Sequence, residues 1–212
     1  MDVKFYRRRK GERVSGFIVQ ARNHRTTLLV FILIITGLTA GALMIKFNDP
    51  VTEIIVSYFK NFSGLVVTRS FFENFLSLFF VNELFVVISY VFGLCAIGAP
   101  IVCSLPLIKG IGIGAVSAYF YKAYALTGFG YCMLIFFPPQ IIYLFSMIIS
   151  ANESFTMSKE IYYNTLKISR NSSQSVSVKM YNLRMILSFI ITLFGALSGS
   201  LLNTYLSGIF EF

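Results

Sequence analysis

Few side chains in this sequence have the types and spacing that catalysis or metal binding requires. Its single histidine, His24, lies in a basic N-terminal stretch, and no aspartate or glutamate falls within the predicted membrane spans. Cys95, Cys103 and Cys132 have neither a CxxC spacing nor a neighbouring histidine, so we interpret them as packing residues. Because hydrolysis requires a positioned base, a carboxylate pair or a metal-bound water, the sequence predicts a protein that is not an enzyme and has no catalytic residue, metal site or cofactor.

One lysine and one proline-rich break lie within apolar sequence and could serve transport. Transporters often place ionisable groups or discontinuous helices near the bilayer midplane. Lys109 and Pro138-Pro139-Gln140 could face each other across a cavity, as in a small permease or channel component, or they could be a snorkelling loop lysine and a packing kink. Both interpretations stay open. The candidate hinge residues of the core are Pro100, Lys109, Gly110, Gly112, Gly114, Pro139 and Gln140.

The composition indicates that helices within a lipid bilayer hold these residues in place. The chain has 212 residues, of which 56% are hydrophobic and only 13% are charged. Its apolar blocks are long enough to cross a hydrocarbon layer of about 30 Å, which takes roughly 20 helical residues. The expected fold is therefore all-α, a polytopic membrane helical bundle. The net charge of +9 is concentrated at the ends of the apolar blocks, so we expect contact with membrane lipid and not with nucleic acid.

We expect five membrane spans in one membrane domain at residues 28–206, after a basic arm at 1–27. The spans are predicted at about residues 28–45, 84–105, 111–126, 131–150 and 185–205, with a polar inner loop at 151–184. Pro100, Pro106 and the glycines that follow predict a hairpin turn between the second and third spans. The double proline should kink the fourth span. Ala40-Gly41-Ala42 resembles a signal-peptidase site, and cleavage there is the rival to an uncleaved first span.

The outer loop at 47–83 has the pattern of two amphipathic interfacial helices. Asp49 and Pro50 predict the start of the first helix, and Ser70-Phe71-Phe72-Glu73 has the form of a capping box at the start of the second. Their apolar stripes could lie flat on the bilayer, pack on the bundle or bind a partner. The candidate partner-binding residues are Ile54, Ile55, Tyr58, Phe59, Phe62, Phe72, Phe75, Leu76 and Phe79.

The distribution of basic residues predicts the orientation in the membrane. With a cytoplasmic N-terminus, fourteen lysines and arginines would lie inside and four outside, because the inner set holds the arm, Lys109 and the basic last loop. We therefore expect a multi-pass protein of a bacterial cell membrane with a cytoplasmic N-terminus and an extracytoplasmic C-terminus. Glycines spaced by four, at Gly37 and Gly41, Gly110 and Gly114, and Gly195 and Gly199, suit a compact bundle or a homo-oligomer.

The central part of the chain carries a set of glycine and proline motifs. They are Gly93-Leu94-Cys95-Ala96-Ile97-Gly98-Ala99-Pro100, Leu107-Ile108-Lys109-Gly110 with Gly112 and Gly114, Gly128-Phe129-Gly130, and Pro139-Gln140. In these residues, and in the order of its elements, the chain resembles the stage II sporulation protein M family. The resemblance implies a non-catalytic scaffold in the mother-cell septal membrane, which recruits stage II sporulation proteins D and P. These partners degrade peptidoglycan during engulfment in endospore formation.

Overall fold

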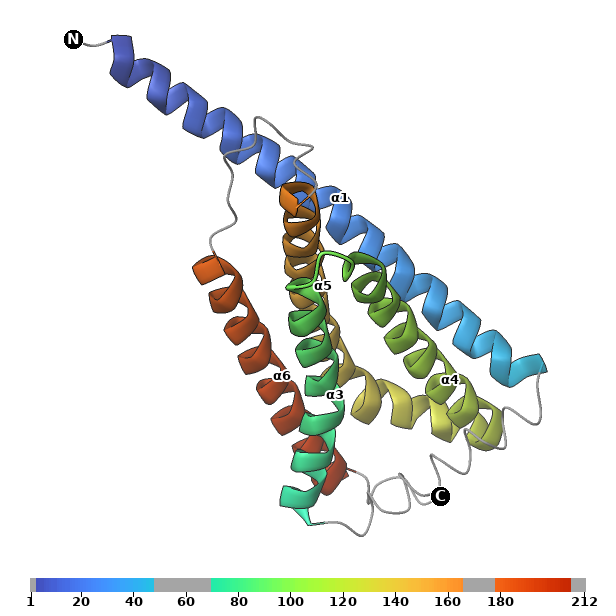
Figure 1. Cartoon of the computed structure of the whole chain (residues 1–212). Helices are drawn as coiled ribbons and strands as arrows, with labels where there is room; N and C mark the ends of the chain where they lie inside the picture. Colours follow the sequence, from blue (N-terminus) through green and yellow to red (C-terminus); the bar gives the residue numbers. More distant parts are fainter. Residues whose placement is uncertain (1–2, 48–69, 166–177, 207–212) are drawn as a thin grey trace.

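The computed structural model describes residues 3–47, 70–165 and 178–206, and within these ranges every long element is helical (Figure 1). The helices are α1 (Val3–Phe47), α3 (Phe71–Gly93), α4 (Ala99–Tyr131), α5 (Phe137–Thr165) and α6 (Val178–Leu206), and a π-helical turn, η1 (Cys132–Phe136), joins α4 to α5. Four segments are long and apolar enough to cross a membrane: Arg25–Phe47, Phe71–Gly93, Ala99–Tyr163 and Val178–Leu206. The prediction of an all-α bundle of apolar helices is confirmed.

The helices form two groups that pack against each other. Helix α1 packs chiefly on α4, whereas α3, α5 and α6 pack on one another, with α5 also contacting α4. The N-terminal half of α1 projects beyond the other helices (Figure 1). The start of α4, the end of α5 and the start of α6 lie toward that end of the bundle, and the start of α3 lies at the opposite end (Figure 1).

Glycines bring α1 and α4 into backbone contact. A Cβ atom on Gly37 would meet Leu107 O, and one on Gly41 would meet Ile111 O. On the facing helix, a Cβ on Gly114 would meet Leu38 O. Because the contacts advance in the same direction along both helices, α1 and α4 run parallel. Two of the three glycine pairs singled out by their spacing thus pack against each other, as expected for small residues at a membrane helix interface.

Helix α3 contradicts the predicted division of residues 70–105. The second amphipathic helix and the first half of the second span form one helix, which ends at Gly93. Its polar side chains Asn82, Glu83 and Ser89 are buried, while Phe72 and Phe80 are 63% and 64% exposed. The stripe that suggested an interfacial helix therefore arises because α3 is polar toward the bundle and apolar on the outside. Ser70 is the N-cap residue, but its side chain makes no capping hydrogen bond, so the capping box is wrong.

The predicted hairpin turn near Pro106 is also wrong. Helix α4 runs through Pro106 and the glycines that follow, and the chain turns instead between Gly93 and Ala99. Gly98 makes that turn possible because a Cβ there would collide with the Phe92 carbonyl group. Pro106 is buried inside α4. Of the glycines after it, Gly110 and Gly114 pack closely on α1, whereas a Cβ on Gly112 would meet no atom within 4 Å.

The connection between α4 and α5 has two irregularities. Ala125 has φ 46° and ψ −118°, which breaks α4 near the predicted end of the third span at residue 126. The π-helical turn η1 then precedes Pro138 and Pro139, whose missing N–H groups cannot continue the regular ladder. In Figure 1 the yellow segment between these points crosses the end of the bundle before α5 turns along it.

The connection between the last two helices is shorter than the predicted inner loop. Helix α5 continues to Thr165, so the expected inner loop at 151–184 is helical in its first part. Helix α6 includes the whole of the expected last span. Residues 166–177 of that loop and the first predicted amphipathic helix, which was to begin near Asp49, lie outside the described residues.

Candidate functional site

A cavity of about 400 Å³ lies among α3, α4, α5 and α6. Most of its wall is apolar, and its polar groups come from Asn82, Lys109, Tyr131, Gln140, Tyr143 and Asn203. The remaining lining residues are Leu78, Val81, Phe85, Ile108, Gly112, Ile113, Val116, Phe120, Ile135, Phe136, Pro139 and Gly199. An apolar pocket with a few convergent polar groups is the usual form of a small-molecule site.

Lys109 contributes a positive charge to this cavity. Its Nζ atom donates a hydrogen bond to Asn82 Oδ1 and lies 5.5 Å from the centre of the Phe85 ring and 5.4 Å from that of Tyr143. Cation–π contact of this kind partly replaces lost hydration. Within the described part of the chain Lys109 forms no ion pair, whereas Arg184 pairs with Glu153. An ammonium group without a carboxylate partner therefore lies inside the bundle.

Two buried polar atoms from α5 line the same cavity. Gln140 is 8% exposed and Tyr143 is 2% exposed, and neither Gln140 Oε1 nor the Tyr143 hydroxyl has a hydrogen-bond partner among the described residues. Elsewhere on the wall, the Tyr131 hydroxyl donates to Asn203 Oδ1 at 3.3 Å. Because a buried polar atom without a partner costs roughly 1–3 kcal/mol, the unsatisfied atoms mark this wall as a candidate binding surface.

The structure settles where the candidate hinge residues lie. Lys109, Gly112, Pro139 and Gln140 all line the cavity, so Lys109 and the proline break border the same space. The alternative of a snorkelling loop lysine is wrong, because Lys109 lies inside α4. The other three lie apart from it: Gly110 and Gly114 pack on α1, and Pro100 is exposed in the first turn of α4.

The candidate partner-binding residues fall into two sets. Five of them lie outside the described residues: Ile54, Ile55, Tyr58, Phe59 and Phe62. On α3, Phe72 is exposed, whereas Phe75, Leu76 and Phe79 are half-buried. Phe79 packs edge-on against Phe189 of α6, with ring centres 5.4 Å apart. Phe72 is thus the described member of the set with the most accessible ring.

Sequence reasoning missed a line of serines on α5. Ser146, Ser150, Ser154 and Ser158 recur every fourth residue, and each is at most 1% exposed. Ser146 lies 2.8 Å from the Thr192 hydroxyl of α6. Further along, Ser154 contacts the Tyr181 hydroxyl at 3.2 Å, and Ser158 donates to Cys95 O at 2.7 Å. The spacing of four small polar residues was the available signal, since hydroxyl groups commonly bond between membrane helices.

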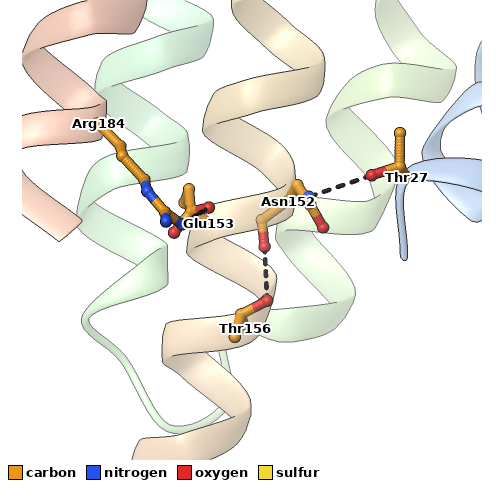
Figure 2. Close-up of polar contacts among 5 residues, drawn as sticks. All are labelled: Thr27, Asn152, Glu153, Thr156 and Arg184. Carbon is orange, nitrogen blue, oxygen red and sulfur yellow. Dashed lines mark hydrogen bonds and ion pairs between the residues drawn. The ribbon is translucent and has the colours of Figure 1, made fainter. Parts of the chain in front are cut away.

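A second missed group ties α5 to α1 and α6 (Figure 2). Asn152 Nδ2 donates to Thr27 Oγ1 of α1 at 3.2 Å, and Arg184 of α6 pairs with Glu153. Figure 2 shows the two side chains leaving α5 toward opposite partners, and Thr156 Oγ1 donates to Asn152 O at 2.8 Å. With the observed helix bounds, Glu83 and Glu153 both lie within helices and are buried, unlike the acid-free spans that were predicted.

Comparison with known proteins gives one match. The family model described as stage II sporulation protein M matches residues 30–207, which include the C-terminal part of α1 and all the later helices. No curated protein and no solved structure shows significant similarity to the chain. A match over this much of the sequence confirms the resemblance seen in the glycine and proline motifs. This chain therefore belongs to the stage II sporulation protein M family.

Proposed function

We propose that this chain is a non-catalytic membrane scaffold that recruits stage II sporulation proteins D and P to the septum during engulfment. The observation that carries the proposal is the family match over residues 30–207. The bundle of long apolar helices supports it, because such a bundle anchors its partners at a bilayer. Recruitment would hold peptidoglycan-degrading proteins beside the wall that must be removed.

The outer end of α3 is the proposed contact surface within the described residues. Phe72 lies in the first turn of α3, at the end of the bundle opposite the projecting part of α1 (Figure 1). If the basic arm is cytoplasmic, this end faces the cell wall. Exposed aromatic rings are frequent anchors of protein interfaces because they bury a large area.

A pair of α3 variants tests this surface. Phe72→Ser should reduce co-purification of proteins D and P several-fold while membrane insertion is kept. Leu84→Ser is the matched control, because Leu84 is 58% exposed on the same helix but lies about three turns deeper. Equal recovery of both partners with Phe72→Ser and the parent chain would remove this surface from the proposal.

A small permease or channel component is the second candidate function, and the cavity beside Lys109 favours it. Its test is chloride and acetate efflux from proteoliposomes that contain the purified chain. Flux that Lys109→Ala changes would favour the permease. Liposomes that stay tight with either chain would favour the scaffold.

A further inference from the structure

The cavity beside Lys109 reaches the outer surface of the bundle between α3 and α4. Val81 of α3 and Ile108 of α4 both line it, and each is 50% exposed. Gly112 lies one turn from Ile108 on the same wall and is also exposed. Exposed apolar residues on a membrane helix face hydrocarbon. A molecule in the lipid phase can therefore enter the cavity without crossing water.

The size and walls of the cavity suit an apolar chain. Its volume of about 400 Å³ lies within the range of ligand sites, roughly 300–1,000 Å³. Along α4 the wall extends from Ile108 to Phe120, which is about 18 Å of helix. Aliphatic and aromatic side chains from α3, α4, η1 and α5 make up most of the wall.

The polar groups of the cavity suit an anionic head group. Lys109 has three N–H donors, and Asn82 Oδ1 accepts one of them. The Tyr143 hydroxyl, with no partner among the described residues, can donate a further bond. Lys109, Asn82 and Tyr143 also border a smaller adjoining cavity, which places them together. The Gln140 amide adds another polar contact on the same wall.

We propose that this cavity binds an amphiphile with an anionic head group, whose carboxylate or phosphate oxygens accept hydrogen bonds from Lys109 and Tyr143. Its apolar chain lies along the walls formed by α3, α4 and α5. A charge-assisted bond offsets the cost of keeping an ammonium group inside the bundle. The site is separate from the proposed partner surface at Phe72, so loss of one leaves the other intact.

Binding measurements with defined amphiphiles test the proposal. The chain is purified in a neutral maltoside detergent, and its melting temperature is followed during addition of oleate, phosphatidylglycerol, oleyl alcohol or phosphatidylcholine. The expected result is that oleate or phosphatidylglycerol raises the melting temperature. Oleyl alcohol, whose head group is uncharged, and phosphatidylcholine, whose head group is zwitterionic, should leave it unchanged. A response to oleate alone identifies a fatty acid as the ligand, and a response to phosphatidylglycerol alone identifies a phospholipid. Equal responses to all four probes would overturn the proposal.

Two variants locate the binding to this cavity. Lys109→Met keeps the length of the side chain but removes its charge, and it should weaken anionic binding about tenfold or more. Lys159→Met is the matched control, since Lys159 is exposed and lies against the Phe155 ring, away from the cavity. Gly112→Leu should also abolish binding, because the leucine side chain would occupy the space that the amphiphile needs. The fold should tolerate this change, since a Cβ at Gly112 meets no atom within 4 Å.

The Gly112→Leu variant keeps the test decisive if Lys109→Met does not fold. Each variant is first required to give a single symmetric peak in size-exclusion chromatography. Undiminished anionic binding by folded Gly112→Leu would place the amphiphile elsewhere and contradict the proposal. Retained co-purification of proteins D and P by the same variant would show that the cavity and the scaffold surface act independently.

Discussion

Single buried polar residues give this bundle much of its internal structure. Tyr181 is fully buried, its hydroxyl donates to Tyr90 O at 2.9 Å, and its ring stacks on that of Tyr90 with centres 5.5 Å apart. Gly93 leaves room for it, because a Cβ there would collide with the Tyr181 hydroxyl. In a membrane the hydrophobic effect does not drive helices together, so such hydrogen bonds and close contacts determine which helices are neighbours.

Ala125 offers a direct test of backbone strain at one residue. Its φ of 46° is unfavourable for any residue with a Cβ. Ala125→Gly should therefore raise the free energy of unfolding by about 1 kcal/mol. Melting temperature in detergent is the measurement.

Ala123 supplies the control for that substitution. It is exposed within the regular part of α4, where glycine is expected to cost about 1 kcal/mol. If Ala125→Gly lowered the melting temperature as much as Ala123→Gly does, the strain at Ala125 would be contradicted.

At the level of elements, composition predicted the helices but not all of their ends. The first and last apolar segments were placed well because charged residues flank them. The α3–α4 boundary was misplaced because proline and glycine in a membrane helix can serve packing instead of a turn, as Pro106 and Gly114 do. The sequence allowed a cavity beside Lys109 and Pro139 to be proposed. It could not identify Asn82 and Tyr143 as lining residues, because only the tertiary packing of α3 and α5 places them there.

The parallel contact of α1 with α4 leads to a prediction about helix packing. Gly110→Ala should lower the free energy of unfolding by about 1–3 kcal/mol, because the added methyl group meets the Ile34 carbonyl oxygen. Gly112→Ala should be neutral or stabilising by up to about 1 kcal/mol, since nothing lies near its Cβ. The two substitutions are compared by size-exclusion chromatography after heating. Equal effects would mean that α1 does not pack on this face of α4.

For the whole molecule, the arrangement of helices favours placing the start of α1 and the end of α6 on opposite sides of the membrane. Among the described residues, and with Lys109 inside the bundle, eleven lysines and arginines lie toward the end from which α1 projects, against Lys46 and Lys122 at the other end. We expect five crossings, because the segment Ala99–Tyr163 turns back on itself near Ala125 (Figure 1). A cytoplasmic N-terminus satisfies the positive-inside rule in this arrangement.

Cysteine labelling measures that orientation. After Cys95, Cys103 and Cys132 are replaced by alanine, a single cysteine is introduced as Lys46→Cys or Lys159→Cys, both at exposed positions. An impermeant maleimide should label the Lys46 variant in intact cells and the Lys159 variant only after permeabilisation. The reverse result would invert the proposed topology and place Phe72 in the cytoplasm.

The most direct test of the scaffold proposal is the set of proteins that accompanies this chain during sporulation. A tagged copy is purified in mild detergent from sporulating cells of its host, and the bound proteins are identified by mass spectrometry, with a tagged unrelated membrane protein as control. The account predicts enrichment of stage II sporulation proteins D and P. Recovery of neither, or of a transport ATPase in their place, would contradict it.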